Sequence, residues 1–179
     1  VLVADLYKLV VVDPAFTGPK GDSDSRAAIV VLGLDTATSA LLVLEATADK
    51  RDPRDLATDI VHTCKRWKAN RLVIEAVAQQ LSFVRYVESE LQTRGIGMAV
   101  EECRPAGRHK DVRIETLVPH FKGGNLYVHA GQHQLLQEYR DFKPGAKHKD
   151  LLDALAYAVE KCPRYGSADG KSLREKNAE

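Results

Sequence analysis

Cysteine is scarce in this chain of 179 residues, and its placement excludes two kinds of site. The three cysteines, Cys64, Cys103 and Cys162, are far apart, and no CxxC pair occurs. The pattern therefore indicates neither a disulfide framework nor a zinc site, and it suits a reducing cytoplasm. Long apolar runs are also missing. None approaches the roughly 20 residues that cross a bilayer, so we expect no membrane-spanning segment.

Net charge is nearly absent too, because 26 basic residues stand against 25 acidic ones. Nucleic-acid binding therefore has no global electrostatic signature, and any basic surface must be local. The phosphate-loop pattern G-x-x-x-x-G-K-[ST] is missing as well. The tail segment GSADGKS has one intervening residue too few, and no strand precedes it. The chain thus lacks the sequence signature of an ATPase.

The residues that are present are typical of a folded globular protein. Hydrophobic residues make up 44% of the chain and charged residues 28%, and the length suits one domain with a sizeable core. We expect that domain over residues 1–163. The polar segment that follows, residues 164–179, reads as a C-terminal tail.

The periodicity of apolar residues predicts an α/β protein. Three β-branched runs, at 8–13, 26–35 and 40–49, are separated by short or turn-rich connections, which favours an antiparallel meander. Helices and strands then alternate, and we expect helices at 52–70, 79–95, 110–124, 133–142 and 147–161 and strands at 71–77, 96–103 and 125–129. Pro119 is expected to kink the last turn of its helix. The order predicts a mixed sheet of five or more strands with helices on both faces.

Carboxylates occupy the ends of two of these strands. Asp13 ends the first run, VVVDPA, and Glu75 ends the strand RLVIEAV. In the expected topology these strands are parallel neighbours, which would bring both side chains to one sheet edge.

The helix KHKDLLDALAYAVEK carries two more carboxylates, Asp150 and Asp153, within an almost wholly apolar segment. Residues three and four apart share a helix face, so one interpretation is a solvated stripe that includes Tyr157. The other is that this helix crosses the sheet edge and brings both aspartates to the strand-end carboxylates. Such a cluster cannot stay ionised without a cation, and oxygen ligands suit Mg²⁺ or Mn²⁺. Two such ions about 4 Å apart promote phosphodiester hydrolysis.

Three segments, VVVDPAFTGPKGDSDSRAAIVVLG, RLVIEAV and KHKDLLDALAYAVE, together resemble the nuclease domain of phage large terminase subunits. The resemblance covers about residues 8–161 and implies the RNase H-like fold, which is related to Holliday-junction resolvases. It also implies a metal-dependent endonuclease that cuts double-stranded concatemeric phage DNA during genome packaging in the host cytoplasm. Its implied partners are DNA, the terminase ATPase domain, the small terminase subunit and the portal. Because no phosphate loop is found, we expect the nuclease module alone.

Carried over by residue, the resemblance assigns Asp13 as the carboxylate that bridges two ions, Mg²⁺ or Mn²⁺. Glu75 and Asp153 would be the second and third ligands, with Asp150 as a fourth ligand or a close neighbour. An acidic residue in the loop after DPA corresponds to Asp24, with Asp22 as the alternative. It would lie behind the ligands or on the substrate side, or it is simply a turn residue.

Positive charge gathers in two segments, CRPAGRHKDVR and RDFKPGAKHK. Both are candidates for binding DNA phosphates, and the residues singled out are Arg108, Lys110, Arg113, Lys147 and Lys149. A solvated charged surface is the alternative for each segment. His148, two residues before Asp150, is either a loop histidine or a metal ligand, proton carrier or phosphate contact.

Three other functions remain to be compared with the packaging nuclease. A junction resolvase would share the chemistry, but it would be expected to dimerise and to prefer branched DNA. A non-catalytic docking module would be expected to lack one or more of the carboxylates, and all of them are present. An actin-like ATPase would need a D-x-G-type phosphate turn, whereas Pro14 and Ala15 follow Asp13.

Overall fold

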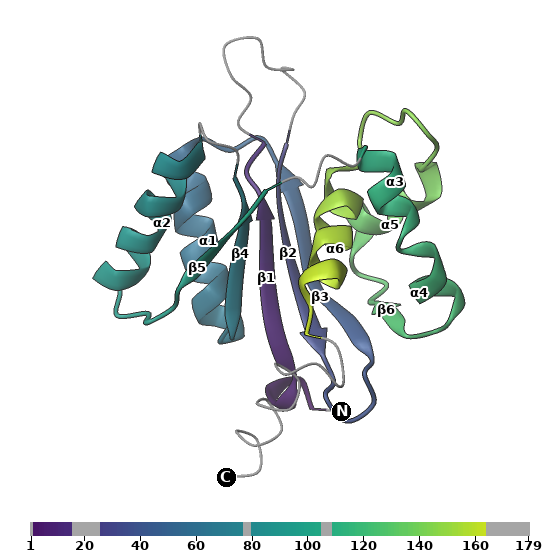
Figure 1. The fold of residues 1–179 in the computed structure, drawn as a ribbon, viewed down its shortest axis with the longest axis horizontal. Helices are drawn as coiled ribbons and strands as arrows, with labels where there is room; N and C mark the ends of the chain where they lie inside the picture. The colour runs from purple at the N-terminus through teal and green to yellow at the C-terminus, as the bar shows by residue number, and fades with distance from the viewer. Residues whose placement is uncertain (1, 16–25, 77–79, 105–108, 164–179) are drawn as a thin grey trace.

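The computed structural model describes residues 2–15, 26–76, 80–104 and 109–163 (Figure 1). A single sheet of six strands runs through this part of the chain, with helices on both sides. The strands are β1 Tyr7–Asp13, β2 Ala27–Leu34, β3 Leu41–Asp49, β4 Arg71–Glu75, β5 Val100–Cys103 and β6 Leu126–Val128. The helices are a short 3₁₀ turn η1 Val3–Asp5, then α1 Pro53–Trp67, α2 Leu81–Thr93, α3 Lys110–Glu115, α4 Val118–Lys122, α5 His133–Asp141 and α6 Asp150–Lys161.

The strand order across the sheet is β5-β4-β1-β2-β3-β6. β1, β2 and β3 form the expected antiparallel meander, whereas β4 lies parallel to β1, β5 parallel to β4, and β6 parallel to β3. The expectation of a mixed sheet is therefore confirmed, and so is the parallel pairing of the first and fourth strands. Because β1 and β4 are parallel neighbours, their carboxyl ends meet at the same edge of the sheet.

Two apolar cores lie on opposite faces of the sheet. α1 and α2 cover one face, and α6 with the smaller helices α3, α4 and α5 covers the other (Figure 1). Along β1, Val10 and Val12 contribute to the α1–α2 core, while Leu9 and Val11 contribute to the α6 core. Successive strand residues point to opposite faces, so a strand covered on both sides is apolar without interruption.

The same alternation determines where the strand-end carboxylates point. Asp13 continues the series of Leu9 and Val11. Val73 also belongs to the α6 core, and Glu75 follows it by two residues. In the parallel register Val12 pairs with Ile74, and Asp13 and Glu75 come next. Both carboxylates are therefore directed to the face that α6 covers.

The helix expected at 110–124 is divided in two, which corrects the sequence prediction. α3 ends at Glu115, and α4 begins at Val118. Pro119 has no amide hydrogen to donate to the carbonyl of Glu115, and its ring crowds that carbonyl. The helix consequently breaks before the proline instead of kinking in its last turn.

α6 lies against β1, β2 and β3 and is buried along nearly its whole length. Asp153 is 0% exposed and Tyr157 2% exposed, so the interpretation of this face as a solvated stripe is wrong. Within the described residues, no helix is long and apolar enough to cross a membrane.

Candidate metal centre

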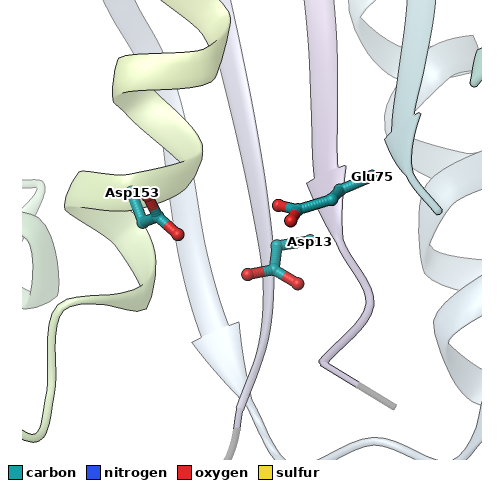
Figure 2. A group of neighbouring side chains, drawn as sticks. All are labelled: Asp13, Glu75 and Asp153. Carbon is teal, nitrogen blue, oxygen red and sulfur yellow. The ribbon is translucent and has the colours of Figure 1, made fainter. Parts of the chain in front are cut away.

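Three carboxylates from distant parts of the chain converge at the carboxyl ends of β1 and β4. Asp13, Glu75 and Asp153 each offer one oxygen, and these oxygens all lie within 4.8 Å of one another. Figure 2 shows Asp153 reaching from α6 towards the two strand-end side chains. The sheet and the buried helix hold all three on regular secondary structure, which is the rigid support that an ion site requires.

The surroundings of Glu75 suit a bound cation. Its Oε2 atom is buried and has no hydrogen-bond partner among the described residues. Burial is the largest cause that raises the pKa of Glu75, and the negative charges of Asp13 and Asp153 add to it. The pKa reaches about 7. An unsatisfied buried carboxylate oxygen is costly, and a divalent ion with oxygen ligands would remove that cost. The three side chains therefore fit Mg²⁺ or Mn²⁺.

Lys110, at the start of α3, places its ammonium group among the carboxylates. Its Nζ lies 3.3 Å from Asp153 Oδ2, 3.5 Å from Asp13 Oδ2 and 4.0 Å from Asp150 Oδ1. Burial opposes the charged form, but these three aspartates outweigh it and raise the pKa of Lys110. The side chain is 43% exposed, so it both offsets the carboxylate charge and faces solvent.

Arg113 does not lie where the sequence prediction put it. We expected a phosphate contact on the surface, but the guanidinium is buried and forms a two-pronged ion pair with Asp153, with Nε–Oδ1 and Nη2–Oδ2 distances of 2.6 Å. It also donates to the Tyr157 hydroxyl at 2.9 Å and lies 4.0 Å from the centre of that ring. The planar guanidinium suits this paired geometry, and only 3% of Arg113 is exposed.

Asp150 lies beside the three-carboxylate group but outside it. The residue is 8% exposed, and its Oδ2 is 3.5 Å from Arg26 Nε. Burial raises the pKa of Asp150, and the cations of Lys110 and Arg26 oppose that shift. Its role as a fourth ligand stays a prediction.

The remaining candidates do not belong to the three-carboxylate group among the described residues. Lys147 and His148 are exposed in the segment before α6. Lys149 forms an ion pair with Asp111. Asp22, Asp24 and Arg108 lie outside the described residues.

Two side chains near the centre escaped the sequence analysis, namely Glu138 of α5 and Arg26, the residue before β2. Glu138 is buried and bonds to Arg26, with an Oε1–Nη2 distance of 2.6 Å. The helical spacing held a signal for it, since Leu135 and Glu138 are three residues apart and share a buried face. Nothing in the sequence indicates that Arg26 is the partner.

The raised pKa of Glu75 has a measurable effect on stability in the absence of metal. The folded protein holds this proton with a pKa of about 7, against an ordinary value of 4.5. The stabilisation that protonated Glu75 gives the folded state is therefore complete below pH 4.5 and is lost as pH rises through 7. Allowing for partial exposure, we expect the free energy of unfolding to fall by about 2 kcal/mol between pH 5 and pH 8 in EDTA.

Urea unfolding of the wild type and of Glu75→Gln at both pH values tests this expectation. The Gln variant keeps the shape without the titrating group, so it should lose most of the pH dependence. Glu115→Gln, on the exposed face of α3, is the matched control and should behave as the wild type. Equal pH dependence in the wild type and Glu75→Gln would contradict the assignment.

Comparison with solved structures identifies the fold. The human cytomegalovirus terminase nuclease domain superposes with a TM-score of 0.64 at 17% identity, over 88% of this chain and 83% of that chain. The bacteriophage SPP1 large terminase nuclease domain with bound Mn gives 0.54 at 17% identity, over 87% and 86%. The fowlpox virus Holliday junction resolvase gives 0.55 at 14% identity, over 86% and 95%. These likenesses confirm the expected RNase H-like fold.

The family follows from the sequence itself. No curated protein matches the chain. A family model described as the terminase RNase H-like domain, however, matches residues 10–161, a range that contains all four predicted metal-ligand carboxylates. The resemblance inferred from the strand-end and helix motifs is thereby confirmed, and the chain belongs to the family of terminase RNase H-like domains.

Proposed function

We propose that this chain is a divalent-metal-dependent endonuclease domain that cuts double-stranded, concatemeric phage DNA during genome packaging. The observation that carries the proposal is the convergence of Asp13, Glu75 and Asp153, with a buried Glu75 oxygen that has no described partner. Family membership supports it, and so does the Mn named for the similar SPP1 domain.

The proposed ligands are held in place by the surrounding protein. Asp13 and Glu75 are held by the sheet, and Asp153 is held by Arg113, so the ligands are oriented before any ion arrives. Two Mg²⁺ or Mn²⁺ ions, when bound, would activate water and stabilise the leaving 3′-oxygen. Asp150 is proposed as the fourth ligand. The single ammonium group of Lys110 lies within 4.0 Å of Asp150, Asp13 and Asp153, so all three aspartates can face one cation.

The proposed DNA surface lies on the α3 and α6 side of the centre. Lys110 reaches the carboxylates while remaining partly exposed, so it is placed to meet a phosphate. Lys147 and His148 line a cavity of about 380 Å³ together with Arg26 and Lys143, and the acidic Glu138 and Asp141 also line it. Arg26 contacts Asp150. We assign phosphate contacts to Lys110 and Lys147, and to Lys149 if its pairing with Asp111 opens. Arg113 is left out because it is buried.

The wider assembly is proposed from the family alone. An ATPase domain would supply DNA translocation, while a small terminase subunit and a portal would present the DNA. For a phage this places the reaction in the host cytoplasm. All three converging carboxylates belong to this chain.

Metal removal tests the proposal directly. Supercoiled plasmid incubated with the chain should be nicked and linearised in Mn²⁺ or Mg²⁺ and left intact in EDTA. Absence of cutting with either ion would favour a docking module or a nuclease that requires its ATPase domain. A four-way junction offered beside a linear duplex separates the remaining alternative, because a resolvase would cut the junction in preference.

A further inference from the structure

The first turn of α6 is capped by a residue from another helix. Lys149 occupies the position before the helix and makes no capping bond with its side chain. The backbone amides of Leu151 and Leu152 instead donate to Glu138 Oε2, at 2.9 and 3.2 Å. The first amides of a helix have no partner within it, and a side-chain oxygen normally supplies one from the adjacent residue. Here α5 supplies that oxygen from 13 and 14 residues away.

Glu138 is itself held on its second oxygen. Its Oε1 accepts from Arg26 Nη2 at 2.6 Å, and the side chain is only 5% exposed. Arg26 Nε lies 3.5 Å from Asp150 Oδ2, so one guanidinium connects the capping carboxylate to the first residue of α6. Both oxygens of Glu138 therefore form contacts that hold the first turn of α6 in place.

α5 is fastened to the sheet, which gives this cap a fixed base. Gln132 accepts from the amide of Ala46 and donates to the carbonyl of Leu44, both at 3.0 Å. Gln134 makes a similar pair of bonds to the backbone of Ala48, at 3.3 and 3.4 Å. The side-chain amides of Gln132 and Gln134 thus bond to the backbone of β3 beyond Val43, the last residue of β3 that pairs with β6. The start of α6 is thus tied through α5 to the sheet that carries Asp13.

We propose that Glu138 is a positioning residue for the metal centre, acting by capping the turn that carries Asp150 and Asp153. This inference rests on the proposed function, since it assumes that the carboxylates bind a divalent ion. Glu138 does not reach the three-carboxylate group. Its effect comes through the helix, because a displaced first turn would move Asp153 away from the two ligands held by the sheet.

The test measures Mn²⁺ binding by calorimetry, without DNA, on the wild type, Glu138→Ala and Glu138→Gln. Residues behind metal ligands typically change metal affinity by about 10–100-fold when replaced. We expect Glu138→Ala to weaken Mn²⁺ binding by about tenfold or more. Glu138→Gln keeps an acceptor oxygen for the two amides, so it should recover a large part of that loss.

A general loss of stability is controlled by a second helix cap. Asp52 accepts from the amides of Arg54 and Asp55 at the start of α1, on the opposite face of the sheet. Asp52→Ala removes a cap of the same kind, and we expect its Mn²⁺ affinity to match the wild type. Each variant is first checked for cooperative unfolding, and binding is measured well below the unfolding temperature.

The outcomes separate this inference from the function beneath it. Glu138→Ala binding Mn²⁺ as tightly as the wild type would overturn the positioning role and leave the metal centre standing. Equal weakening in Glu138→Ala and Asp52→Ala would also overturn it, since the effect would then be one of stability. A wild type that binds no Mn²⁺ would overturn the metal centre and this inference together.

Discussion

Asp13→Asn is expected to reduce metal-dependent cleavage of plasmid DNA by roughly 10³-fold while the fold is retained. Asp13 ends β1 and belongs to the three-carboxylate group, and it also contacts Lys110. Losing its charge removes transition-state stabilisation of ~4 kcal/mol, in the range found when one electrostatic group of an active site is deleted. Asn keeps the shape and an acceptor oxygen for the Ala15 amide, which bonds to Asp13 Oδ1 at 3.0 Å.

The comparison needs three measurements on the purified chain. Cleavage rates in Mn²⁺ report the loss, urea unfolding in EDTA reports the fold, and DNA binding in EDTA reports the surface. Relief of carboxylate repulsion should leave the metal-free variant at least as stable as the wild type. Asp5→Asn, on the exposed 3₁₀ turn, is the control and should keep full activity. A fully active Asp13→Asn enzyme would remove the metal centre from the mechanism.

The second large effect concerns stability. Asp153→Ala is expected to lower the free energy of unfolding by about 3–5 kcal/mol, because it leaves the buried Arg113 guanidinium without its counter-charge. Asp153 and Arg113 are 1% and 4% exposed in their side chains, with oxygen and nitrogen as close as 2.5 Å. This variant is consequently a poor probe of catalysis, since loss of activity would be mixed with loss of fold.

A double replacement, followed by urea unfolding, tests the pair. Replacing both residues with apolar ones, as in Arg113→Met with Asp153→Leu, should be less destabilising than Asp153→Ala alone. The exposed pair Arg94–Glu90 on α2 is the matched control, with 3.2 Å between its charged atoms, and breaking it should cost less than ~0.5 kcal/mol. An Asp153→Ala effect as small as that of the control would show that the buried pair contributes little.

Much of the fold could be predicted because local pattern and topology agree. The apolar run of β1 is continuous, since helices cover both faces, and Asp52 and Pro53 mark the start of α1. A meander followed by crossover units leaves few possible sheet orders, and this placed Asp13 beside Glu75. The helix at 110–124 was predicted less well. A proline can either kink a helix or divide it, and the sequence pattern does not distinguish these two outcomes for Pro119.

The sequence by itself determined the carboxylates at two strand ends, the aspartates of an apolar helix, and hence the family. Strand alternation and chain order are local properties, and they suffice for that. Only the tertiary structure decided the partners. Arg113 turned out to hold Asp153 from 40 residues away, and Glu138 to cap α6 from α5. A charged residue in a sequence looks the same whether it is solvated or buried, and burial is decided by how whole helices pack. That packing made Arg113 an internal counter-charge and left Lys147 on the surface.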